Sequence, residues 1–170
     1  AFLKVVGSGI VLTLAAPVLT SCSGVTSTLD AVLEGKRSFT DDAGRQMTLP
    51  TADRLKRIYF TSTAAQIFCF TLMPSLLAGT AFKFTKEELA YLPAGTASLP
   101  YMGTLTDGGQ INREMLLTED VQIVFSISSV GLTDQNISEA ETLQNATKIP
   151  VLCFDGSMER IAQCYRRLGD

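Results

Sequence analysis

The chain has 170 residues, with 14 Lys or Arg, 17 Asp or Glu and no His, which gives a formal net charge of −3. This acidic balance argues against nucleic-acid binding, which requires a basic surface. The lack of histidine excludes a Ser-His-Asp or Cys-His catalytic set and histidine-ligated zinc sites within this chain. Hydrophobic residues make up 46% and charged residues 18%, which favours one domain with a real core.

The N-terminal segment predicts a bacterial lipoprotein signal peptide over residues 1–22. Lys4 gives a positive start, and an uncharged apolar stretch follows over residues 5–18. That stretch is shorter than the roughly 20 apolar residues of a transmembrane helix. Residues 19–22 end in Cys22 and resemble the lipobox, so we expect Cys22 to be lipidated at the outer face of the cell membrane. The alternative is an ordinary signal peptide that happens to end near a cysteine.

A linker and a hairpin come next. Residues 23–37 contain Ser, Thr and Gly with little periodicity and predict a flexible tether that spans about 20 Å. Residues 39–41 and 46–49 flank an Asp/Gly turn at residues 42–45 and predict a β-hairpin, which Pro50 closes.

Strands and helices then alternate. Residues 57–61 predict a strand, and Ser62 or Thr63 can cap a helix over residues 64–72. Residues 76–80 predict a second buried strand. A capping box at Thr85 and Glu88 starts a short helix to about residue 91, and residues 101–103 predict a brief strand.

The second half continues the alternation. Asn112 caps a predicted helix over residues 113–117, residues 121–126 predict the clearest strand, and Thr133 or Asp134 caps a helix to about residue 145. Residues 151–154 predict another strand, and Ser157 can cap a last helix. Its predicted apolar stripe has helical spacing and consists of Met158, Ile161, Ala162, Tyr165 and Leu168.

This order of elements predicts an α/β fold with a Rossmann-like parallel sheet covered by helices on both faces, preceded by the hairpin. In such sheets ligands bind beyond the carboxyl ends of the strands. The loops expected there are residues 61–64, 80–85, 101–106, 126–134 and 154–157.

Three cysteines remain beside Cys22. Cys69, Cys153 and Cys164 lie in apolar contexts without the Cys-x-x-Cys spacing of metal or redox sites. They are interpreted as small buried hydrophobic residues, and one disulfide with one remaining thiol is the alternative.

Residues 39–45 resemble the opening hairpin of the substrate-binding proteins of ABC importers for iron-siderophores, haem and cobalamin. Further segments follow in that family's order, and the resemblance covers residues 38–170. Those segments are residues 54–58, 89–103, 111–117, 121–126 and 149–155. The resemblance implies two α/β lobes joined by a long helix, with cargo held between the lobes. Residues 38–156 would be the N-terminal lobe and residues 157–170 the start of the joining helix, with the C-terminal lobe absent.

The resemblance implies a non-enzymatic, lipid-anchored protein that delivers an iron-siderophore, haem or corrinoid to a permease and ATPase, with no intrinsic cofactor. The candidate ligand-binding residues on the loops are Thr63, Phe82, Phe84, Tyr101, Met102, Ser128, Ser129 and Asp155. Tyr101 could coordinate haem iron or serve as a wall or surface residue. For Thr63 and Asp155 the alternative to ligand binding is a role as helix caps.

Two other functional classes compete with this one. A membrane-anchored single-lobe protein that senses or scaffolds, without a transport role, is the alternative. An enzyme is not expected, because the sequence contains no Gly-x-Gly-x-x-Gly, P-loop or Gly-x-Ser-x-Gly motif.

Overall fold

The computed structural model describes residues 34–105 and 109–169, and every element below belongs to the compact unit that starts at residue 35. The predicted signal peptide, Cys22 and the tether up to residue 33 lie outside the described residues. None of the helices in these two ranges is long and apolar enough to cross a membrane.

The predicted hairpin is confirmed as β1 (Lys36–Thr40) paired antiparallel with β2 (Gln46–Pro50). The larger sheet consists of β3 (Ile58–Phe60), β4 (Ile123–Ser128) and β5 (Val151–Asp155), all parallel, in the order β3-β4-β5. The α-helices are α2 (Thr63–Leu72), α3 (Lys86–Leu89), α4 (Arg113–Thr118), α5 (Asp134–Thr147) and α6 (Ile161–Gly169). Single 3-10 turns are η1 (Ala52–Arg54), η2 (Pro74–Leu76) and η3 (Thr96–Ser98).

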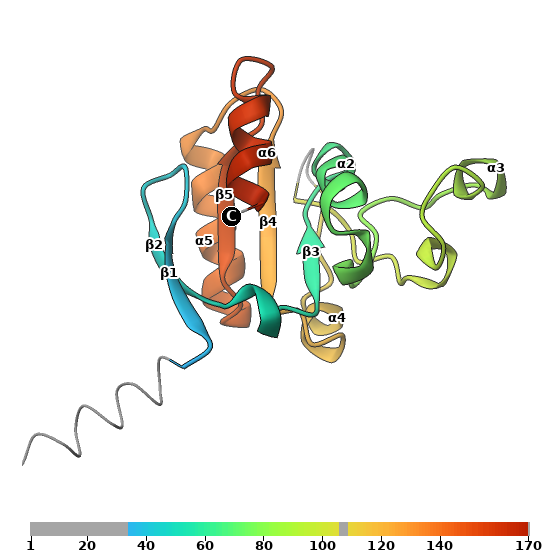
Figure 1. Cartoon of the computed structure of the whole chain (residues 1–170), viewed down its shortest axis with the longest axis horizontal. Helices are drawn as coiled ribbons and strands as arrows, with labels where there is room; N and C mark the ends of the chain where they lie inside the picture. The colour runs from blue at the N-terminus through green and yellow to red at the C-terminus, as the bar shows by residue number, and fades with distance from the viewer. Residues whose placement is uncertain (1–33, 106–108, 170) are drawn as a thin grey trace, which may run out of the picture. The chain divides into compact units, whose positions relative to one another are not determined.

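Helices cover both faces of the parallel sheet, which confirms the predicted α/β class (Figure 1). Along β3 the side chains of Ile58 and Phe60 point to one face and that of Tyr59 to the other, because successive residues of a strand alternate. The first face packs on α2 and α6, through residues such as Phe68 and Leu168. The second packs on α4 and α5. Both faces of the sheet are therefore buried under apolar side chains, as expected for strands with continuous apolar runs.

The predicted strand at residues 76–80 is only partly correct. The segment runs parallel to the sheet but forms isolated bridges, from Leu77 to Ile58 and from Thr80 to Tyr101. Its two ends have different neighbours, so no two consecutive ladder pairs form. The predicted strand at residues 101–103 likewise reduces to the bridge at Tyr101.

The predicted strand over residues 121–126 is shifted by two residues. Val121 N–H donates to Leu116 O at 3.0 Å and closes the turn after α4, so β4 starts at Ile123. At its other end β4 continues to Ser128, which pairs with Asp155. Both residues were expected in loops and instead end strands.

The last helix also differs from the prediction. Arg160 N–H donates to Ser157 O at 2.9 Å in a separate turn, and α6 begins only at Ile161. Met158 is therefore out of phase with the helix and 79% exposed. Ala162 is exposed as well, while Cys164 is fully buried, so the buried stripe contains Ile161, Cys164, Tyr165 and Leu168.

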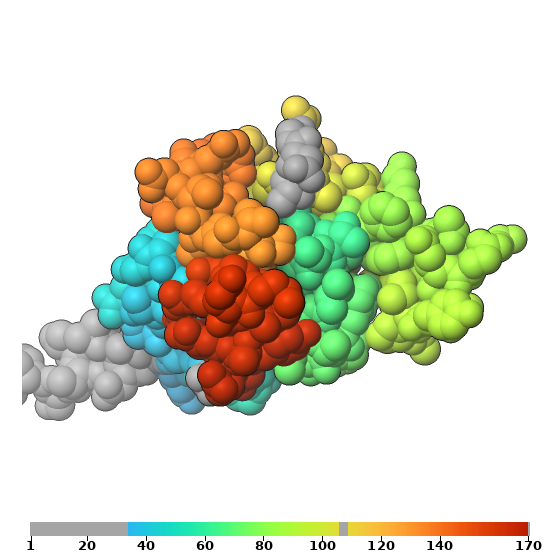
Figure 2. All heavy atoms as spheres, turned by 90° about the horizontal axis from the view of Figure 1, so that it is seen from above, coloured from blue at the N-terminus to red at the C-terminus, as the bar shows by residue number. Residues whose placement is uncertain are grey.

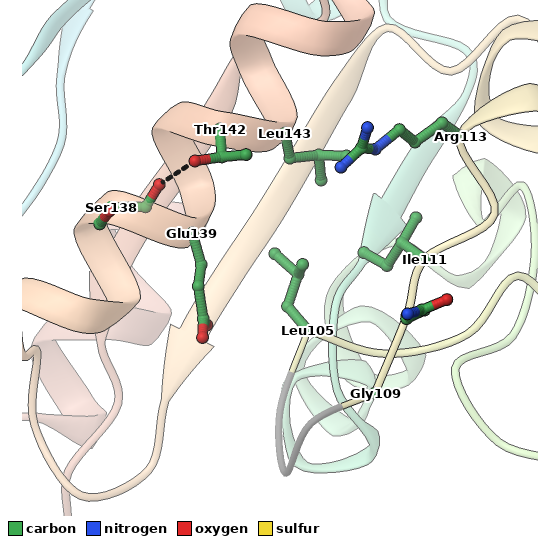
Figure 3. Close-up of a pocket in the computed structure, with 9 residues that line it drawn as sticks. Leu105, Gly109, Ile111, Arg113, Ser138, Glu139, Thr142 and Leu143 are labelled. Atoms are coloured by element: carbon green, nitrogen blue, oxygen red, sulfur yellow. Dashed lines mark hydrogen bonds between the residues drawn. The ribbon is translucent and has the colours of Figure 1, made fainter.

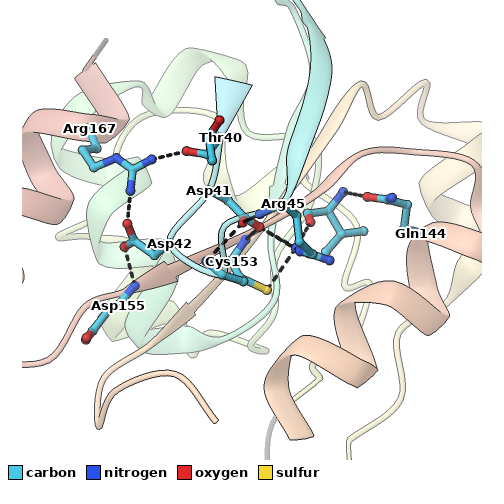
Figure 4. Close-up of polar contacts among 10 residues, drawn as sticks. Thr40, Asp41, Asp42, Arg45, Gln144, Cys153, Asp155 and Arg167 are labelled. Atoms are coloured by element: carbon cyan, nitrogen blue, oxygen red, sulfur yellow. Dashed lines mark hydrogen bonds and ion pairs between the residues drawn. The ribbon is translucent and has the colours of Figure 1, made fainter. Parts of the chain in front are cut away.

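The turn of the hairpin completes the outer edge of β5 (Figure 4). Asp42 N–H donates to Cys153 O at 3.0 Å, and Cys153 N–H donates to the Asp41 carboxylate at 3.0 Å. Two residues further along, Asp155 N–H donates to the Asp42 carboxylate at 2.9 Å. Two carboxylates thus take the place of a neighbouring strand's carbonyl groups.

Arg167 joins α6 to the same turn. Its guanidinium donates to the Asp42 carboxylate and to Thr40 O, and lies 5.2 Å from the ring centre of Phe39 and 5.4 Å from that of Phe154. The hairpin, β5 and α6 are consequently held together by one polar network with aromatic cover.

Candidate ligand-binding site

β3, β4 and β5 end at one edge of the sheet, and residues that follow β3 and β4 line two adjoining pockets. Figure 2 looks onto the molecule from above the view of Figure 1, where the orange surface between β4 and α5 adjoins the green surface of α2. At the end of β3 the chain turns at once into α2, because Ser62 has extended geometry and its hydroxyl accepts from Ala65 N–H at 3.1 Å. Ser62 is therefore the cap, and Thr63 is the first helical residue.

The larger pocket, called here the hydroxyl pocket, has a volume of about 670 Å³. Most of its polar side chains carry hydroxyl or amide groups, and Glu139 is the one ionisable side chain among the described residues that line it. They are Ser62, Thr63, Ala64, Leu105, Ser126, Ile127, Ser128, Ser129, Val130, Thr133, Gln135, Asn136 and Glu139.

Two local hydrogen-bond patterns shape this pocket. The Ser128 hydroxyl donates to Gly131 O at 2.5 Å and fixes the turn after β4. Thr133 and Asn136 then form a capping box that starts α5, with Asn136 N–H donating to the Thr133 hydroxyl at 3.2 Å. The walls are thus determined by local sequence, before any ligand binds.

The second pocket, called here the aromatic pocket, has a volume of about 500 Å³ and shares Thr63 with the first. Its walls are two partly exposed rings, one lysine and small residues: Thr63, Ala81, Phe82, Lys83, Tyr101, Thr104 and Gly109. The Phe82 ring packs edge-on against Phe84 with centres 5.4 Å apart. Backbone hydrogen bonds of the residues on both sides of Tyr101 fix its position in the pocket wall. Met102 N–H, for example, donates to Thr80 O at 2.9 Å.

A groove of about 500 Å³ continues along the flank between α4 and α5. In Figure 3 the side chains of Leu105, Ile111 and Arg113 lie opposite those of Glu139 and Leu143 on α5. Leu105 and Glu139 line both this groove and the hydroxyl pocket, so the two hollows adjoin.

Five of the eight predicted site residues line the two pockets. They are Thr63, Ser128 and Ser129 in the hydroxyl pocket, and Thr63, Phe82 and Tyr101 in the aromatic pocket. Whether any of them contacts a ligand stays a prediction.

The structure places the other three elsewhere. Met102 is 1% exposed and packs in the core beside Gly79. Phe84 supports Phe82 without lining the pocket. The Asp155 carboxylate accepts from Ser157 N–H at 3.0 Å and lies 3.6 Å from Arg160 Nε, and hydrogen bonds from the Ser157 hydroxyl and N–H hold its pKa below the ordinary value.

Sequence reasoning missed several lining residues. Ser62 was interpreted only as a helix cap, and Asn136 and Glu139 were interpreted only as parts of a helix. They come into the pocket because the first turns of α2 and α5 both lie at the carboxyl edge of the sheet. Lys83 lies between Phe82 and Phe84 in the sequence, and that position beside an exposed ring was the available signal.

The three described cysteines are buried thiols. Cys69, Cys153 and Cys164 are free and buried, which confirms the interpretation as buried hydrophobic residues. Burial raises the pKa of Cys69 to about 12 and that of Cys164 to about 11, so both stay protonated at neutral pH. Within residues 34–105 and 109–169, no group of three or more His, Cys, Asp or Glu could hold a metal ion.

Comparison with known proteins defines the class of fold. No protein-family model and no curated protein sequence matches this chain. Among solved structures it is similar to an ABC transporter solute binding protein from Sulfurospirillum deleyianum DSM 6946, with a TM-score of 0.66 and 19% identity over 78% of this chain and 41% of that chain. The α/β fold described above therefore matches one lobe of a solute-binding protein. This chain spans about two fifths of the length of that protein.

More remote similarities were found to the heme binding protein HmuT and to a point mutant of it. Their TM-scores are 0.43 and 0.47, each with 18% identity, over 75% and 77% of this chain and 38% of each HmuT chain. At these scores they add nothing to the assignment of fold.

Proposed function

We propose that this chain is a substrate-binding lipoprotein of an ABC importer and that its cargo is an iron-siderophore, haem or corrinoid. The observation that carries the proposal is the pair of pockets at the carboxyl edge of the sheet, which share Thr63 and combine hydroxyl groups with exposed rings. Ligands of open α/β sheets bind at this edge. The likeness in fold to a solute-binding protein supports the same reading.

The chemistry of the pockets suits a chelated metal better than a bare ion. A chelate already satisfies its metal, so it needs apolar walls and a few polar groups for orientation. Phe82 and Tyr101 offer such walls, and Ser128 and Ser129 offer hydroxyl groups. Bare zinc is commonly held by imidazole, and the sequence has no histidine.

The remaining assignments belong to the same proposal. Cys22 would carry the lipid anchor outside the cytoplasmic membrane, and residues 23–37 would be the tether. β1 already begins at Lys36, so the last two residues of that tether are part of the hairpin. Residues 38–156 would be the N-terminal lobe and residues 157–170 the start of the helix toward a second lobe. Permease and ATPase would be the partners, and no catalytic step is involved.

Intrinsic fluorescence offers a direct test, because the chain has four tyrosines and no tryptophan. The full chain is titrated with ferric siderophores, hemin and cyanocobalamin, and saturable quenching by one of these classes is expected. By calorimetry, Tyr101→Ala should weaken that binding by about three- to tenfold, since one aromatic contact contributes on the order of 1 kcal/mol. Tyr91→Ala is the matched control, because Tyr91 is 91% exposed and lines neither pocket. No saturable response to any of the three classes would refute the proposal.

A single-lobe interaction protein is the second candidate, and one observation favours it. Val130 is 87% exposed and Met158 is 79% exposed, and they follow the ends of β4 and β5. Exposed apolar side chains on one edge favour association with another protein surface. Sedimentation distinguishes the two functions: a stable dimer that binds none of the chelates favours interaction, and a monomer that binds one favours transport.

A further inference from the structure

Lys83 is the one charged side chain among the described residues that line the aromatic pocket. Lys83 lies between the two predicted phenylalanines and lines the pocket, and its ammonium group is 5.0 Å from the centre of the Tyr101 ring. Within the described residues Lys83 makes no ion pair. None of the described residues that line this pocket is acidic, and Glu139 lines the neighbouring hollows instead.

The rings beside this lysine are exposed and supported from behind. Phe82 is 43% exposed and Tyr101 is 45% exposed, so each presents part of a ring to solvent. The Phe82 ring is supported by Phe84, which packs in turn on Phe70 of α2 at 6.2 Å between ring centres. Supported rings lose little freedom when a flat ligand stacks on them, which favours such ligands.

A cation over an aromatic face is also suited to a conjugated anion. The ammonium group of Lys83 has three N–H donors, and in the part of the chain that the structure describes it contacts the Tyr101 ring and forms no ion pair with a carboxylate. An incoming carboxylate or phenolate could take those donors, and its ring system could lie against Phe82 or Tyr101. A cationic ligand would instead be repelled at the same place.

We propose that the aromatic pocket selects an anionic chelate with a flat conjugated ring system, and that Lys83 is the residue that sets this preference. The inference rests on the proposed function and narrows its cargo. Porphyrin carboxylates and catecholate oxygens share the required chemistry, whereas a cationic hydroxamate chelate has neither a negative charge nor a conjugated ring system.

The test compares probes of different charge on the full chain. The anionic arms are hemin and a ferric tris-catecholate, which separate the two sources of the same chemistry, and the contrasting arm is ferrioxamine B. At least one anionic probe should bind more tightly than ferrioxamine B. Lys83→Gln should weaken the binding of that anionic probe about tenfold, which corresponds to the loss of one hydrogen bond to a charged group. Lys83→Arg keeps the positive charge and should retain most of the affinity. Lys86→Gln, an exposed change on α3, is the matched control.

Salt gives a readout that a merely structural role would not alter. Raising ionic strength should weaken anion binding to the unmodified chain and leave the residual binding of Lys83→Gln nearly constant. Equal affinity in Lys83→Gln and the unmodified chain, or preference for ferrioxamine B, overturns this inference and leaves the proposed function standing. If no probe binds at all, the proposed function and this inference both fail.

Discussion

Removing the Asp41 carboxylate should destabilise the domain more than its position in a surface turn suggests. The side chain of Asp41 is fully buried and accepts from three backbone N–H groups, those of Ala43, Arg45 and Cys153, at 2.9 to 3.1 Å. It also accepts from the Arg45 guanidinium at 3.0 and 2.6 Å. Asp41→Ala removes the acceptor of the three N–H groups and the counter-charge of Arg45, whose Nη2 keeps only its bonds to Val151 O and Cys153 Sγ among the described residues.

The magnitude follows from the burial of both partners. The Arg45 side chain is 16% exposed, so the substitution leaves a largely buried charge unpaired. Breaking a buried pair from one side costs about 3–5 kcal/mol. A domain of this size is stable by about 5–15 kcal/mol, and a urea slope of about 2 kcal/mol/M converts the loss into a midpoint lowered by roughly 2 M.

Urea denaturation followed by far-ultraviolet circular dichroism measures this shift. Asp53→Ala is the matched control, because Asp53 is an exposed carboxylate on η1 and its removal should hardly move the midpoint. Arg45→Ala combined with Asp41→Ala should cost little more than Asp41→Ala alone, since the two residues act as one unit. A midpoint lowered by less than about 0.5 M in Asp41→Ala would refute the reasoning.

Two further predictions concern backbone fit and buried thiols. Gly103→Ala should cost clearly more stability than Gly44→Ala: both have positive φ, but a Cβ at Gly103 would lie 2.0 Å from Gln110 O while one at Gly44 meets nothing within 4 Å. Gly44→Ala should therefore show only the left-handed penalty of about 1–2 kcal/mol, and equal losses in urea midpoint would contradict this account. Burial raises the pKa of the Cys69 thiol from 9.0 to about 12. The unfolded chain therefore loses this proton at a lower pH than the folded chain, and the free energy of unfolding should fall as pH rises from about 9 toward 12. The decline between pH 8 and 10 should be smaller in Cys69→Ala, and an unchanged decline would argue against burial of this thiol.

Elements with strong local signals could be predicted from the sequence. The capping boxes at Thr85 and Thr133 determine helix starts through side chains three residues apart, so no distant contact is needed to find them. The hairpin was equally local. The α/β class followed because each apolar run was followed by a helix signal.

Elements whose limits depend on distant partners were predicted less well. β4 continues to Ser128 because β5 lies beside it, and the polar sequence around Ser126 concealed that pairing. Met158 appeared to extend the stripe of α6, but a separate turn at Ser157 removes it from the helix.

The candidate site shows the same division. Thr63 and Tyr101 were placed near the pockets by the general rule that loops at the carboxyl edge bind ligands. That rule does not say which side of a loop a side chain takes. The Asp155 carboxylate instead bonds to Ser157 and pairs with Arg160, and Met102 lies in the core beside Gly79, which is far away in the chain.

The carboxylates of the hairpin turn also limit where the chain can be shortened for expression. Without residues 36–50, the N–H groups of Cys153 and Asp155 would form a bare strand edge, and such edges pair with the edges of other molecules. A shortened version that starts at η1 would therefore aggregate rather than give a smaller stable lobe. Any expression boundary, tag or proteolytic site placed in this region has to precede Lys36.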